Sequence, residues 1–150
     1  MRMLAVIVLS FPLAAWGAET TSPTCENLVG VWHNPINSTM TITSVDPSTG
    51  LVTGTYHSAA VSSPVDFKVT GWINSAAPVA GMDNAKVISF AVRFSGIGSI
   101  SAWTGTCRND KKTGVPTLST LYHLIRPNSK QEYDHIATNS EVFTPGPPPS

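Results

Sequence analysis

Charge and cysteine are both scarce in this chain. Only 12% of the 150 residues are charged, and nine basic residues balance nine acidic ones to a formal net charge of zero. Proteins that bind nucleic acid through its phosphates need a basic surface, and no basic run or acidic tail occurs here. The composition therefore argues against a nucleic acid as partner.

Helical periodicity and catalytic motifs are missing as well. No segment keeps a helical hydrophobic period over three turns. The sequence contains no HExxH zinc motif, no GxSxG nucleophile motif and no phosphate-binding loop. Its histidines show no metal-ligand spacing; they are His33, His57, His123 and His135. We therefore expect a protein that is not an enzyme and that needs no metal or cofactor.

The longest apolar run stands at the start of the chain. A basic Met1-Arg2 precedes the mostly apolar Leu4–Ala15, and small residues follow at Ala15 and Gly17. The run is too short to cross a bilayer core of roughly 30 Å as a helix, and its pattern is typical of a signal peptide. We expect residues 1–17 to be cleaved, no membrane span, and a secreted or periplasmic protein.

The two cysteines are Cys25 and Cys107. In an exported protein an intramolecular disulfide is the first interpretation, and two unpaired buried thiols are the alternative. A bridge that closes so long a loop would stabilise the fold by roughly 4–5 kcal/mol in the chain-entropy model.

Turn signals recur along the chain and separate short strand-like runs. They fall at residues 46–50, 62–64, 74–84, 109–114 and 126–129. Between them apolar residues alternate with polar or small ones, as at Ile88, Phe90 and Val92. About eight strands result, which predicts an all-β barrel or sandwich.

One strand-like run has an unusual face. In the run 99–104, Ser99, Ser101 and Trp103 share one side. If Trp103 points into a barrel, two hydroxyls point inward with it, and buried hydroxyls need partners. An eight-stranded barrel is wide enough to hold one small ligand, so this face indicates a polar ligand. The alternative is the solvent-exposed face of a sandwich.

Three motifs, in order and separation, resemble the avidin/streptavidin family. They are Trp-x-Asn-x-x-x-Ser at 32–38, Gly-Thr-Tyr-x-Ser at 54–58 and Ser-x-Ser-x-Trp-Thr-Gly at 99–105. The two cysteines also match a pair in avidin. The resemblance implies an eight-stranded antiparallel up-and-down β-barrel with one disulfide over residues 25–144. A short segment at 18–24 precedes it, and a Pro-rich tail at 145–150 follows.

The same resemblance implies a secreted, non-catalytic protein that binds biotin, and it suggests which residues contact each part of the ligand. Donors to the ureido oxygen would be Asn34, Ser38 and Tyr56. Acceptors for the ureido N–H groups would be Ser58 and Glu141, with Asn139 as the alternative if the last strand is offset.

The remaining contacts in this family surround the rings and the tail of biotin. The matching residues here are Phe94, Ser99, Ser101, Trp103, Tyr122, Leu124 and Tyr133. Ser62, in the loop after Ser58, could hold the carboxylate of the tail. Phe94, Tyr122 and Tyr133 stand at positions that are usually Trp. The resemblance also implies a homo-oligomer, a dimer or a tetramer.

Other interpretations remain open on the sequence alone. Asn34 and Ser38 flank Pro35, so both could simply cap a turn. Trp32 and Trp72 suit the core or a subunit contact. The barrel could carry another small ligand in the manner of a lipocalin. The protein could also be an exported inhibitor or adhesion module that acts through its loops.

Overall fold

The computed structural model of the protein describes residues 22–61 and 65–146. The expected signal peptide at 1–17, most of the segment 18–24, Ser62 and the last four residues of the Pro-rich tail lie outside this part of the chain.

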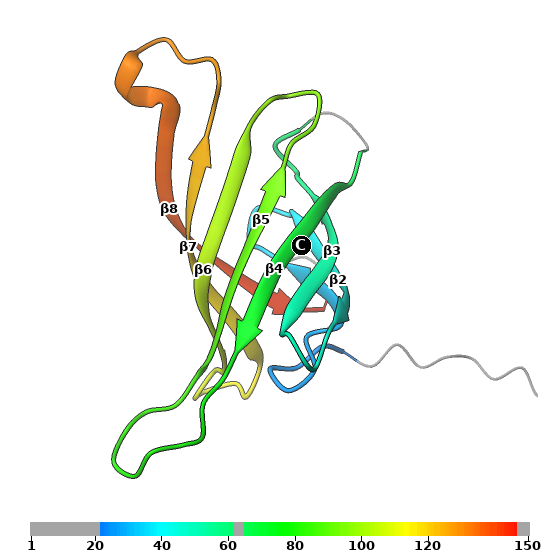
Figure 1. Ribbon diagram of the computed structural model, residues 1–150, viewed down its shortest axis with the longest axis vertical. Coiled ribbons are helices and arrows are strands. Elements are labelled where there is room, and N and C mark those ends of the chain that lie inside the picture. The colour runs from blue at the N-terminus through cyan, green and yellow to red at the C-terminus, as the bar shows by residue number, and fades with distance from the viewer. Residues whose placement is uncertain (1–21, 62–64, 147–150) are drawn as a thin grey trace, which may run out of the picture.

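The described chain forms one closed, antiparallel up-and-down barrel in which each strand pairs with its neighbours in sequence (Figure 1). The strands are β1 (Gly30–His33), β2 (Thr39–Val45), β3 (Leu51–His57), β4 (Phe67–Asn74), β5 (Lys86–Arg93), β6 (Ile100–Asn109), β7 (Pro116–Ile125) and β8 (Ile136–Pro145). A short 3-10 helix, η1 (Glu132–His135), precedes β8. The barrel prediction is confirmed, and the sandwich alternative is wrong. None of the described helices is long or apolar enough to cross a membrane.

Side-chain alternation along each strand separates the interior from the outer surface. On β5, Ile88, Phe90 and Val92 point inward and are at most 3% exposed. Their neighbours Val87 and Ala91 are exposed on the outer surface. A one-residue slip of a strand would reverse every side chain, so burial of the apolar set determines the register.

Connections in an up-and-down barrel alternate between its two ends. The β1–β2, β3–β4, β5–β6 and β7–β8 connections lie at one end, which we call the site end, and the other three lie at the opposite end (Figure 1). Two of the opposite-end turns use the same chemistry. Asp46 and Asp110 each accept backbone N–H bonds within the turn, and each turn closes with a glycine at a φ of 71°.

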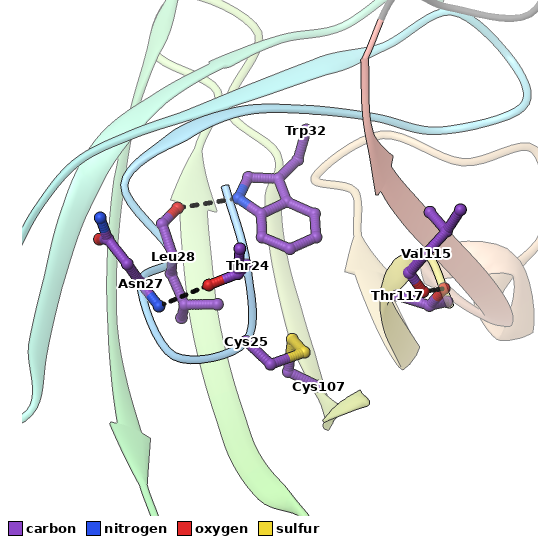
Figure 2. The surroundings of a disulfide bond; sticks show 8 residues. All are labelled: Thr24, Cys25, Asn27, Leu28, Trp32, Cys107, Val115 and Thr117. Carbon is purple, nitrogen blue, oxygen red and sulfur yellow. Dashed lines mark hydrogen bonds between the residues drawn. A yellow bond between two sulfur atoms is a disulfide. The ribbon is translucent and has the colours of Figure 1, made fainter. Parts of the chain in front are cut away.

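The disulfide joins Cys25, in the segment before β1, to Cys107 on β6 (Figure 2). Beside it, the indole N–H of Trp32 donates to the backbone oxygen of Leu28 at 2.9 Å. Leu28 and Trp32 are 2% and 0% exposed, so this segment packs into the interior. Trp72 differs, because it is 55% exposed on the outer surface and does not belong to the core.

We expect loss of the disulfide to destabilise the barrel without changing its strand order. The bridge spans 82 residues of sequence, and replacing both cysteines by alanine should cost roughly 2–5 kcal/mol of unfolding free energy. Denaturant unfolding of the double variant measures the loss, and the intact mass of the parent should be lighter by two hydrogens. Two reactive thiols under non-reducing conditions would contradict the bridge.

Candidate functional site

Polar side chains are buried inside the barrel, mostly toward its site end. Among the described residues the buried polar ones are Asn34, Ser38, Ser58, Ser99, Ser101 and Thr120. Burying such groups is unfavourable unless they form hydrogen bonds, and no described buried side-chain nitrogen or oxygen lacks a partner. A buried polar network of this kind indicates a candidate ligand-binding site and not only a packed core.

The β1–β2 loop holds Asn34 in a defined orientation. The side-chain oxygen of Asn34 accepts the backbone N–H of Ser38 at 2.7 Å, and Asn37 adopts a φ of 64°. Asn34 does cap a turn, as the alternative interpretation held. It caps the turn through its oxygen only, so its amide NH₂ group is left to face the interior. The hydroxyl oxygen of Ser38 accepts the backbone N–H of Ala59 at 3.1 Å and so connects two loops of the site end.

Glu141 on β8 is the acceptor at the centre of the cluster. One carboxylate oxygen accepts the side-chain amide N–H of Asn34, and the other accepts the indole N–H of Trp103 at 2.6 Å. Asn139, two residues earlier, is exposed, and its side-chain oxygen accepts the backbone N–H of Ser140. On β8, Glu141 and not Asn139 therefore faces the cluster.

Burial changes the titration of two groups in the cluster. Burial raises the pKa of Glu141, and the bonds from Trp103 and Asn34 offset part of that rise. The pKa of Tyr56 is also raised, first by burial and then by the nearby carboxylate of Glu141, with Ser38 and Asn34 opposing the rise. Tyr56 therefore keeps its proton and can donate a hydrogen bond.

Aromatic rings surround the polar cluster, with Trp103 in the middle. Its ring lies 5.5 Å from Tyr56, 5.7 Å from Tyr122 and 4.9 Å from Phe90, and it stacks on Phe90. Phe94 meets Tyr56 edge to face at 6.2 Å. Phe90 was not among the residues proposed from sequence. The alternation of Ile88, Phe90 and Val92 could have shown that it points inward, whereas its pairing opposite Trp103 depends on the register of β5 and β6.

The other sequence-based candidates divide into inward and outward groups. Ser58, Ser99 and Ser101 are buried, and Leu124 is partly buried against the core. The hydroxyl of Ser101 donates to the backbone oxygen of His123 at 3.2 Å. Tyr133 lies on η1 with 79% of its surface exposed, so it does not join the interior of its own barrel.

The site thus places donors and an acceptor close together inside an aromatic enclosure. The amide of Asn34 and the hydroxyl groups of Ser38 and Tyr56 can donate, and the carboxylate of Glu141 can accept. Such a set suits a small, mostly apolar ligand that carries one strong acceptor beside N–H donors.

The sequence model of the Avidin family matches residues 22–146. The chain belongs to the Avidin family. Among solved structures, this Avidin-family barrel is similar to Xenavidin, with 28% identity over 81% of this chain and 98% of that one, and a TM-score of 0.64. It is also similar to apo shwanavidin, with 27% identity over 79% of this chain and 100% of that one, and a TM-score of 0.59.

A third similar structure is described as a biotin binding protein from chicken. It shares 24% identity over 82% of this chain and 99% of its own, with a TM-score of 0.66, and this likeness shows the fold alone. No curated protein sequence matches this Avidin-family chain at a significant level.

The raised pKa of Glu141 predicts a pH-dependent stability. A carboxyl whose pKa is higher in the folded protein binds more protons there than in the unfolded chain, so its contribution is largest below its ordinary value of 4.5 and is lost as pH rises through the folded pKa. Glutamine does not titrate. We expect the unfolding free energy of the parent, minus that of Glu141→Gln, to fall as pH increases above 4.5.

Urea unfolding of both proteins across a pH series measures this difference. Asp110→Asn provides a control of opposite sign, because hydrogen bonds from the backbone and hydroxyl of Thr113 lower the pKa of Asp110 from 3.8. Its stabilising effect is present above that pH and is lost as pH falls. A parent-minus-Gln difference that stays constant or grows with pH would contradict the assignment for Glu141.

Proposed function

We propose that the protein is a secreted or periplasmic, non-catalytic binding protein whose ligand is biotin. Its membership of the Avidin family supports a ligand-holding barrel. The observation that carries the proposal is the convergence of Asn34, Trp103 and Glu141, from three separate strands or loops, on one hydrogen-bonded cluster. The disulfide supports export, because such bonds persist in oxidising compartments.

The donors of the cluster would bind the ureido oxygen of biotin. Asn34, Ser38 and Tyr56 are 1%, 1% and 4% exposed, so bonds from them form away from bulk water. Hydrogen bonds are stronger in such surroundings. Several donors on one carbonyl oxygen would draw negative charge onto it and strengthen each bond.

The ureido N–H groups would donate to Ser58 and to Glu141. The rings and the tail of biotin would then lie against Trp103, Phe94, Tyr122 and Leu124, with Ser99 and Ser101 adding hydroxyl contacts. Ser62, proposed from sequence for the carboxylate of the tail, lies outside the described residues. A module that acts through exposed loops alone would need no such buried donors, so the cluster favours a held ligand.

The second part of the proposal is a homo-oligomer, a dimer or a tetramer. The outer surface of the barrel exposes large apolar side chains, including Trp72, Val87, Ile100 and Leu121, each at least 49% exposed. Surfaces of this kind mark contacts with another protein. Tyr133, exposed on η1, would then cover the pocket of a neighbouring subunit, where the family usually has a Trp.

We expect removal of any one ureido donor to weaken biotin binding. Asn34→Ala, Ser38→Ala and Tyr56→Phe should each raise the dissociation constant roughly tenfold or more, because each leaves a buried carbonyl partly unsatisfied. The three effects should be non-additive, since all act on one oxygen. Calorimetric titration with biotin measures them.

Matched controls come from exposed residues of the same types. Asn139→Ala removes an exposed amide on β8, and Ser75→Ala removes an exposed hydroxyl at the opposite end. Both should bind biotin like the parent. If all three donor variants also bound like the parent, the pocket would be wrongly placed.

The oligomer makes a separate prediction about ligand release. Light scattering at micromolar concentration should report at least a dimer. Tyr133→Trp should slow biotin release, because a larger ring buries more of the ligand. The control Met82→Trp enlarges an exposed side chain in the β4–β5 connection and should leave release unchanged. A monomer, or an unchanged release rate in Tyr133→Trp, would remove Tyr133 from the pocket.

A further inference from the structure

We propose that Glu141 competes internally with the ligand for the amide of Asn34, and that it thereby sets the affinity of the pocket. The inference rests on the proposed function, because it concerns the same pocket. It starts from one contact: a carboxylate oxygen of Glu141 accepts the side-chain N–H of Asn34. That amide is also the donor assigned to the carbonyl oxygen of the ligand.

The contact with Glu141 commits one of the two N–H groups of the Asn34 amide, and that N–H cannot serve both partners. The side-chain oxygen of Asn34 accepts the backbone N–H of Ser38 at 2.7 Å, which fixes the plane of the amide. The two N–H groups of an amide point in different directions, so the one directed at Glu141 is not available to another acceptor. A ligand carbonyl that needs this N–H must displace the carboxylate.

The length of the Glu141 side chain explains why the contact exists. An Asp at this position would be shorter by one methylene, or about 1.5 Å. The shorter side chain would withdraw its oxygens from both Asn34 and Trp103 if the backbone stayed in place. The backbone is held, because the hydroxyl of Thr120 donates to the backbone oxygen of Glu141 at 2.8 Å.

The two carboxylate oxygens have separable roles. The indole N–H of Trp103 binds one of them at 2.6 Å and keeps the carboxylate inside the cluster. The other oxygen can then exchange the N–H of Asn34 for an N–H of the ligand. Ligands that bring an N–H beside their carbonyl would satisfy this oxygen after displacement, while ligands with a carbonyl alone would leave a partly buried acceptor without its donor.

Glu141→Asp tests the competition, because it keeps the charge and shortens the reach. We expect this variant to bind biotin up to about tenfold more tightly than the parent, the effect of removing one competing hydrogen bond. Glu26→Asp makes the same shortening at an exposed position near the disulfide and should bind like the parent. Calorimetric titration with biotin compares the three proteins.

A second measurement uses the parent protein itself. In nuclear magnetic resonance spectra the side-chain amide signals of Asn34 should move on addition of biotin, while the indole N–H signal of Trp103 keeps the shift of a hydrogen-bonded donor. The Asn34 signals of Glu141→Asp should differ from those of the parent before biotin is added. This comparison holds even if the affinity of the variant is altered by a change in folding.

The outcomes separate this inference from the proposed function. If neither the parent nor Glu141→Asp binds biotin, the proposed function fails and this inference fails with it. If the parent binds biotin but Glu141→Asp binds no more tightly, and the free Asn34 amide signals are the same in both, the internal competition is overturned while biotin binding stands.

Discussion

Closure between β1 and β8 is the constraint on which the rest of the barrel depends. β1 has four residues, and its pairing with β8 involves Trp32 with Pro145 and His33 with Thr144. An open seam would leave the N–H and C=O groups of two edge strands exposed. Two interactions support this short seam. The disulfide anchors the segment before β1 to β6, and the bond from Asn34 to Glu141 joins the loop after β1 to β8.

The candidate site and the seam therefore share residues. Asn34 begins the loop that follows β1, and Glu141 lies on β8, so the cluster that would recognise the ligand also links the two strands that close the barrel. Removal of either partner would leave a buried polar group unsatisfied, which costs more than the bond itself contributes. Binding variants at these positions should therefore be compared at equal stability.

The polarity of the side chains inside the barrel increases along its axis, from the disulfide toward the site end. Near the disulfide it is filled by apolar side chains such as Leu28, Leu118 and Phe143, each at most 2% exposed. Toward the site end, hydroxyl, amide and carboxylate groups appear among the aromatic rings. A packed apolar end gives the polar end a rigid support, which binding groups need if their geometry is to be maintained.

The sequence by itself determined much of this description. Alternation and turn residues predicted short strands but left the direction of Trp103 open, and the resemblance to the avidin/streptavidin family selected Asn34, Ser38 and Tyr56, which do lie buried. The strands and turns are local features, since strand periodicity and turn chemistry depend on neighbouring residues. Alternation alone left a barrel and a sandwich open, and the family resemblance implied the barrel that the structure confirms. Tertiary structure decided the inward direction of Trp103, the choice of Glu141 over Asn139, the place of Phe90 beside Trp103 and the bond from Asn34 to Glu141. These structural outcomes depend on the register between strands that are distant in sequence. The bond from Asn34 to Glu141 joins residues 107 positions apart. It forms because the barrel closes, and no local sequence pattern encodes that closure.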